Sequence, residues 1–147
     1  MGVIRAHQTN YINRVLKDFK MDQSNATKTP AQAGADLAPA ESMTNEQIEQ
    51  MKKTPYRSAV GSLMHAAKTT VPKIALAVNQ LTRFFNNPEP KHWEAVKRVL
   101  RYLRNPRAMK GLIYSKEGNP ELIAYVDSDW GQHEYTKRRS VTGFVIF

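Results

Sequence analysis

Two aspartates near the end of this 147-residue chain have the types and spacing best suited to chemistry. Asp127 and Asp129 follow an apolar stretch in the run ELIAYVDSDW. Carboxylates at a strand end supply the hard oxygen ligands that Mg²⁺ prefers, and a bound Mg²⁺ can assist phosphoryl chemistry. A two-metal site needs several converging carboxylates, so this pair could be only part of one. On spacing alone, a turn whose Asp side chains accept from nearby amides is the commoner arrangement.

Basic residues form the second group of candidates. The formal net charge is +9, from 22 Lys and Arg against 13 Asp and Glu, which favours nucleic acid over membrane as a partner. Residues 91–110 hold seven Lys or Arg and one acid. An ordinary solvated helix face or turn is the alternative interpretation. The candidate phosphate contacts are four cations on one face of a predicted helix and three in a predicted loop: Lys97, Arg98, Arg101 and Arg104, then Lys137, Arg138 and Arg139.

Other catalytic or metal-binding patterns are weak. The four histidines (His7, His65, His92 and His133) fit no ligand spacing, so we expect them at surface or boundary positions. The sequence has no Gly-rich phosphate loop and no serine nucleophile elbow. It has no cysteine, which excludes disulfides and thiolate zinc ligands and favours a reducing compartment. With no signal-peptide pattern and no bilayer-length apolar run, we expect an intracellular protein of the cytoplasm or nucleus that is not secreted.

Helical periodicity dominates the first two thirds of the chain. Between the first two helices, residues 22–40 are rich in Ala, Ser, Thr, Pro and Gly, which predicts a linker or an extended crossing segment. Ser42 or Thr44, with Glu46, could open a short helix ending near Met51. The helices predicted over residues 56–69 and 72–87 are joined by a short turn, so they should pack as a helical hairpin. The remaining helices are predicted over residues 8–20, capped by Thr9 or Asn10, and over residues 91–104.

The period changes to two after Asn105-Pro106. Strands are predicted over residues 110–115, 121–128 and 140–147. The predicted fold class is therefore α+β, with an N-terminal helical region of three to four helices followed by an incomplete antiparallel sheet of about three strands. The last strand would leave an unpaired edge, so we expect aggregation or partial disorder in the final third.

Several blocks then match a known family in order and in spacing. YRSAVGSLMH, HWEAVKRVLRYL, AYVDSDW and KRRSVTGFVIF resemble conserved blocks of the Pol polyprotein of copia-type LTR retrotransposons. The family patterns read about YRS-x-VGSLMY, HW-x-AxKR-x-LRYL, Y-x-DADWAGD and RRS-T-GYVF. The match covers residues 56–147 strongly and the N-terminal part weakly. Val71 and Lys73 depart from it, because the family has Arg and Asp around the intervening proline.

The resemblance implies a role for each segment. Residues 1–55 would be a thumb-like helix plus an extended linker, residues 56–107 a helical connection region of the reverse transcriptase, and residues 108–147 the truncated start of a ribonuclease H-like domain. Asp127 would be the first ribonuclease H carboxylate and a Mg²⁺ ligand, with Asp129 as a further candidate ligand. The two basic groups would lie along an RNA–DNA hybrid, contacting its backbone and 2′-hydroxyls.

The resemblance also implies missing parts. The paired polymerase aspartates would precede Met1, and the other ribonuclease H carboxylates would follow Phe147. We therefore expect a Pol fragment that handles RNA–DNA hybrids during reverse transcription but is inactive alone. Mg²⁺ would serve the complete parent enzyme without binding tightly here, and the remaining Pol segments would be partners. A non-catalytic basic nucleic-acid-binding module and a non-functional remnant are the alternatives.

Overall fold

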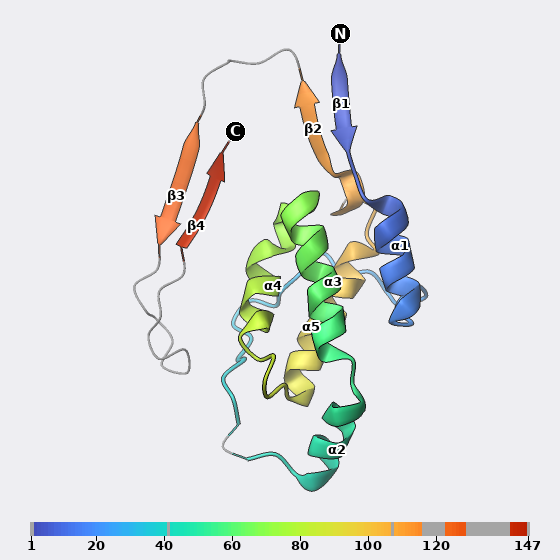
Figure 1. Ribbon diagram of the computed structural model, residues 1–147, viewed down its shortest axis with the longest axis vertical. Coiled ribbons are helices and arrows are strands. Elements are labelled where there is room, and N and C mark those ends of the chain that lie inside the picture. The colour runs from blue at the N-terminus through green and yellow to red at the C-terminus, as the bar shows by residue number, and fades with distance from the viewer. Residues whose placement is uncertain (1, 41, 107, 116–122, 129–141, 147) are drawn as a thin grey trace. The chain divides into compact units, whose positions relative to one another are not determined.

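The fold combines helices with short two-stranded sheets, which confirms the predicted α+β class (Figure 1). The computed structural model describes residues 2–40, 42–106, 108–115, 123–128 and 142–146. These belong to two compact units. The larger unit is Ile4–Tyr114, and the smaller consists of Met1–Val3 with Ser115–Phe147.

The described residues of the larger unit form five α-helices, against the three to four expected in the fold class, because the short helix near residue 50 is well formed. The second helix of the predicted hairpin is shorter than expected. It begins as a 3₁₀ turn at Pro72, whose missing N–H costs nothing there, and its α-helical part ends at Thr82. The helices are α1 Thr9–Asp18, α2 Asn45–Lys53, α3 Tyr56–Thr69, α4 Ala75–Thr82 and α5 Pro90–Leu103, with 3₁₀ turns η1 Pro72–Ile74 and η2 Ala108–Lys110.

The core of the larger unit lies between α3, α4 and α5. The predicted hairpin of α3 and α4 is confirmed by the contacts between the two helices, and Ala59 of α3 is fully buried. The buried Tyr56 hydroxyl donates to the Leu81 carbonyl oxygen at 2.8 Å, which ties the start of α3 to α4. Burial raises the pKa of the Tyr56 phenol, so it remains a donor. Other fully buried side chains are Val60, Leu63, Ile74, Val78, Val96, Val99, Leu100 and Leu103.

The starts of α1 and α2 test the capping predictions. The expected cap of α1 at Thr9 or Asn10 is wrong, because the helix starts at Thr9 and Gln8 holds the cap position without a side-chain cap bond. The Gln8 side chain bonds to α3 instead. The cap of α2 is confirmed at Thr44, whose hydroxyl accepts from the Gln47 N–H at 3.3 Å. Gln47 Oε1 in turn accepts from the Thr44 N–H at 3.0 Å, which completes a capping box.

Four strands form two separate pairs in the described residues. They are β1 Val3–Ala6, β2 Leu112–Ser115, β3 Ala124–Ser128 and β4 Thr142–Ile146. The last three match predicted strands, whereas β1 was not predicted. β2 pairs with β1, and β3 pairs with β4 in antiparallel fashion, so the expected sheet of three strands is divided (Figure 1).

Gly111 explains how β2 reaches β1. Its φ of 70° lies in the left-handed region, and a Cβ at this position would overlap the carbonyl oxygen of Ala6. A glycine is therefore required where the chain leaves η2 and turns alongside β1. Among the described helices, none combines the length and apolar character needed to cross a bilayer.

Candidate functional site

Helix α5 carries the largest group of predicted site residues. Apolar side chains such as Val96 and Leu100 are fully buried on one side of the helix. At 3.6 residues per turn, the four cations fall within about 120° of arc on the other side. All four are half-buried, so this side of α5 is partly covered. We call it the basic side of α5: Lys97, Arg98, Arg101 and Arg104.

The covering element is the stretch of residues 22–40, which contains no helix or strand. We call it the crossing segment, and its lack of helix and strand agrees with the absence of periodicity in its sequence. Its hydrogen bonds to α5 show that the two run in opposite directions. Ser24 meets Arg104 near the end of the helix, and Leu37 meets His92 near its start.

Four hydrogen bonds hold the crossing segment on the C-terminal half of α5, and in one of them the Thr27 hydroxyl donates to the Arg98 carbonyl oxygen at 3.4 Å. Arg104 Nη1 donates to the carbonyl oxygen of Ser24. The Thr27 N–H donates to the Arg101 carbonyl oxygen at 3.3 Å. Arg98 Nη2 donates to Thr29 Oγ1 at 2.9 Å. Two of the predicted nucleic-acid contacts, Arg98 and Arg104, therefore also bind the protein's own chain.

The other two cations of the basic side are placed differently. Lys97 Nζ lies 2.5 Å from Glu94 Oε1 in an ion pair one helical turn apart. Arg101 makes no side-chain hydrogen bond through Nε in the part of the chain that the structure describes, and the same holds for Arg98 Nε. Both Nε atoms are buried. Charged donors left without an acceptor are unfavourable, so these two N–H groups raise the cost of burying the basic side.

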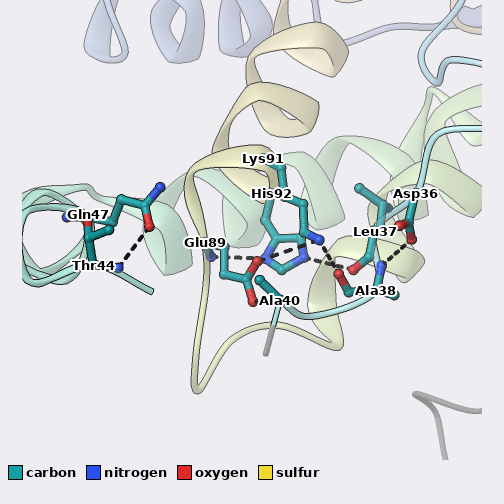
Figure 2. A network of polar contacts seen from close by, with 9 residues as sticks. All are labelled: Asp36, Leu37, Ala38, Ala40, Thr44, Gln47, Glu89, Lys91 and His92. Atoms are coloured by element: carbon teal, nitrogen blue, oxygen red, sulfur yellow. Dashed lines mark hydrogen bonds and ion pairs between the residues drawn. The ribbon is translucent and has the colours of Figure 1, made fainter. Parts of the chain in front are cut away.

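His92 anchors the other end of the crossing segment (Figure 2). Its side chain is fully buried, so the expectation that His92 is a surface or boundary residue is wrong. Nδ1 accepts from the Glu89 N–H at 2.9 Å, which leaves the proton on Nε2 to be donated to the Leu37 carbonyl oxygen at 2.9 Å. The ring stacks on Phe84 with centroids 3.8 Å apart. Burial lowers the His92 pKa and outweighs the Leu37 hydrogen bond and the Glu89 charge, which raise it.

Glu89 is the second buried polar residue of this anchor (Figure 2). Its side chain accepts from the Ala40 N–H at 3.0 Å and lies 3.6 Å from Lys91 Nζ. Lys91 Nζ also donates to the Ala38 carbonyl oxygen. A carboxylate at the start of a helix interacts favourably with its dipole, which helps to offset the cost of burial. The sequence signal was available, since an acid before Pro90 is typical of a helix start.

Two of the other histidines are placed as expected. His7 and His65 are exposed, in agreement with the prediction. The His65 ring contacts the Gln8 side chain, with 2.9 Å between the two nitrogen atoms. His133 lies outside the described residues.

Asp127 lies in β3 of the smaller unit, directly opposite Gly143 of β4. It is exposed, and strand alternation puts it on the same face as Tyr125 and Val145. Within the described ranges, no group of three or more His, Asp or Glu side chains could hold a metal ion. The described residues therefore do not by themselves fit a Mg²⁺ site, and the metal role of Asp127 stays a prediction. The other predicted site residues of this region, Asp129, Lys137, Arg138 and Arg139, lie outside the described residues.

Comparison with known proteins finds two transposon Pol polyproteins and one secreted effector protein among the relatives of this chain. The chain is 40% identical over 140 residues to the retrovirus-related Pol polyprotein from transposon TNT 1-94 of Nicotiana tabacum, covering 95% of this chain and 10% of that protein. It is 38% identical over 96 residues to the Pol polyprotein from transposon RE2 of Arabidopsis thaliana, covering 64% of this chain and 6% of that one. Secreted RxLR effector protein 161 of Plasmopara viticola is 42% identical over 96 residues, covering 65% of this chain and 66% of the effector.

These relatives define the class as retrovirus-related Pol polyproteins of transposons. More particularly, the chain belongs to the copia-type Pol polyproteins and corresponds to a part of one. It spans about a tenth of the tobacco polyprotein. No protein-family model matches it, and no solved structure matches it.

Proposed function

We propose that this chain handles RNA–DNA hybrids as the connection region of a copia-type reverse transcriptase, leading into the start of a ribonuclease H-like domain. The observation that carries the proposal is the gathering of four cations on the basic side of α5, within a chain of net charge +9. The family relationship supports it. Remaining Pol segments would be the protein partners.

The basic side can serve both the crossing segment and a nucleic acid. A guanidinium has five N–H donors, and the bonds of Arg98 and Arg104 to the crossing segment use one each. Further donors can be directed to phosphates, and the ion pair of half-buried Lys97 with exposed Glu94 can exchange for a phosphate contact. Such contacts position a duplex without reading its sequence, which suits a protein that must follow any template.

We further propose that the chain alone binds hybrid without cleaving it. Asp127 is exposed on β3, where a ribonuclease H carboxylate is expected from the family resemblance. Two-metal phosphoryl chemistry requires several carboxylates around the cations, and Asp127 would supply one ligand of Mg²⁺. The missing ligands would come from other Pol sequence.

Binding is tested with a labelled RNA–DNA hybrid at salt concentrations of roughly 50 to 200 mM. Replacing Lys97 and Arg101 by Gln removes two cations whose side chains do not hold the crossing segment through the hydrogen bonds described above. The slope of log K against log salt should fall by about 1.8, because each phosphate contact contributes about 0.9. The matched control replaces Lys53 and Lys68, exposed on α2 and α3, and should change the slope by clearly less. A flat slope for the native chain, or equal losses in both variants, would contradict the proposal.

Cleavage is tested by incubating the purified chain with the same hybrid and Mg²⁺. We expect intact hybrid. Cleavage that disappears in Asp127→Asn would overturn the proposal of inactivity and would show that Asp127 belongs to a working site.

A non-catalytic nucleic-acid-binding module outside a polyprotein is a second candidate. It is favoured by the effector relative, because the similar region makes up two thirds of that protein's length. The two candidates differ in ligand preference. A hybrid-handling segment should bind RNA–DNA hybrid more tightly than double-stranded DNA of the same length, whereas a general module should bind both equally.

A further inference from the structure

The tripeptide Lys-Thr-Pro occurs twice, as Lys28-Thr29-Pro30 and as Lys53-Thr54-Pro55. The two copies lie in different surroundings, so the same local sequence presents its hydroxyl in two ways. We propose that Thr29 is a phosphorylation site for a proline-directed protein kinase, that its phosphate is received by Arg98, and that Thr54 is protected from the same kinase.

Thr29 has the accessibility that a kinase requires. It is exposed, and it lies in the crossing segment, where it belongs to no helix or strand. The proline that follows biases Thr29 toward an extended backbone, the form in which a peptide can enter an enzyme's active site. Its hydroxyl oxygen accepts from Arg98 Nη2, and that single bond is at the surface.

Thr54 offers the opposite case. It is the C-terminal cap of α2, its hydroxyl donates to the Gln50 carbonyl oxygen at 2.8 Å, and its N–H donates to the Met51 carbonyl oxygen at 3.1 Å. Its own carbonyl oxygen accepts from the Tyr56 N–H at 2.8 Å. A kinase would have to open the last turn of α2 and the first turn of α3 to reach this hydroxyl.

The surroundings of Thr29 also suit a phosphate once it is made. The Arg98 guanidinium is already within hydrogen-bond distance of Oγ1, at 2.9 Å. A phosphate adds three strong acceptor oxygens and a charge of about −1.5 to −2 at pH 7. It can therefore replace the neutral hydroxyl as a charged acceptor for the Arg98 Nη2 donor that already contacts Thr29.

The chemical step is an ordinary phosphoryl transfer from ATP. Thr29 Oγ1 forms a bond to the γ-phosphorus, the bond from that phosphorus to the β–γ bridging oxygen breaks, and ADP leaves. The hydroxyl proton passes to the catalytic aspartate of the kinase. The product fastens the crossing segment to α5 and lowers the positive charge of the basic side. The resulting loss of hybrid affinity rests on the proposed function, whereas the modification itself does not.

The first test treats the full 147-residue chain with ATP and a purified proline-directed kinase, and follows each site by mass spectrometry. Synthetic peptides of residues 22–36 and 47–61 give the rates without folded structure. We expect Thr29 to react at least tenfold faster than Thr54 in the folded chain, with similar rates in the two peptides. Thr29→Ala should reduce labelling of the folded chain at least tenfold, and Thr54→Ala should preserve it. Equal rates in the folded chain, or no phosphate on Thr29, would overturn the proposal.

The second test asks whether Arg98 receives the phosphate. Phosphorylation should raise the midpoint of thermal unfolding in the native chain and in the control Lys68→Gln, and should fail to do so in Arg98→Gln. The same rise in Arg98→Gln, or no rise in the native chain, would show that Arg98 does not bind the phosphate. Hybrid affinity is measured separately and should fall several-fold on phosphorylation. If the chain binds no hybrid at all, the proposed function fails while the labelling and unfolding results still decide the modification.

Discussion

His92 donates from Nε2 to the carbonyl oxygen of Leu37 at 2.9 Å, joining residues 55 positions apart in the sequence. The acceptor is a backbone atom in a segment with no regular secondary structure. The first turn of α5 therefore supplies a hydrogen bond that the segment does not make within itself through helix or strand. Arg98 and Arg104 do the same near the other end of the helix. The side of α5 that carries the candidate phosphate contacts is thus also the support of the crossing segment.

Stability should fall as the pH is lowered through the ordinary histidine range. Burial lowers the His92 pKa in the folded chain, so below about pH 6.5 the unfolded chain binds a proton that the folded chain does not. The free energy of unfolding, measured with urea between about pH 5.5 and 7.5, should therefore decrease toward acid. His92→Gln should be less stable and should lose much of this dependence, whereas His7→Gln, at an exposed site, should keep it. Identical pH profiles of the free energy of unfolding for the native chain and His92→Gln would show that His92 does not cause the pH dependence.

Removing the Tyr56 hydroxyl should weaken the α3–α4 pair. Tyr56→Phe loses a buried bond of 2.8 Å to the Leu81 carbonyl oxygen, and we expect a loss of about 1 kcal/mol in urea unfolding. The Leu81 oxygen also accepts from the Phe84 N–H, which limits the cost. Tyr11→Phe is the matched control, because its 3.2 Å bond to the Ser62 oxygen is only partly buried. The control should cost less, and an equal or larger loss there would count against the argument from burial.

Gly111→Ala should destabilise the junction between η2 and β2 more than the same change at another left-handed glycine. Gly34 has a φ of 69°, and a Cβ added there would meet no atom within 4 Å, so Gly34→Ala carries backbone strain alone, about 1 kcal/mol. Gly111→Ala adds an overlap with the Ala6 carbonyl oxygen and should cost more than about 2 kcal/mol. Thermal unfolding of the two variants measures the difference. Similar midpoints would mean that β1 is free to move away.

The β3–β4 pair should promote self-association. Val126 and Phe144 lie opposite each other and are 72% and 71% exposed. Among the described residues β3 and β4 form a two-stranded sheet in which both strands are edges, and hydrophobic edge strands are prone to pair with other chains. Replacing both by Thr should lower the sedimentation coefficient at high concentration toward that of a monomer. Leu76→Thr, at a 67% exposed site on α4, should have no such effect. A lower sedimentation coefficient in this variant would indicate non-specific hydrophobic association.

The helices were predictable because each buries one stripe of its own residues. The periodicity of α5, for instance, separated its buried arc from its cations without any knowledge of neighbours. The cap at Thr44 was predictable from local sequence, although its partner is Gln47, three residues on, and not the expected Glu46. In contrast, β1 has only four residues, Val3–Ala6, and its partner β2 begins more than a hundred residues later. No local pattern records that pairing.

The candidate site was predictable only in part. The sequence located the cations of α5 and the irregular stretch of residues 22–40, but not that this stretch covers the cations. Those contacts use backbone oxygens and short hydroxyl side chains, which leave no hydrophobic pattern. His92 was misjudged for the same reason: its acceptor, the Leu37 carbonyl oxygen, is an atom that every residue possesses. The roles of Asp127 and of the cations in nucleic-acid chemistry stay predictions.

The crossing segment also has a consequence for protein synthesis. Its contacts join positions 49 to 80 residues apart, and in each pair the segment is made first. At translation rates of roughly 5 to 20 residues per second, it leaves the ribosome several seconds before α5 can receive it. During that interval the Thr29 hydroxyl has no Arg98 beside it. A nascent chain thus exposes to chaperones, proteases and kinases a stretch that the finished protein holds in place.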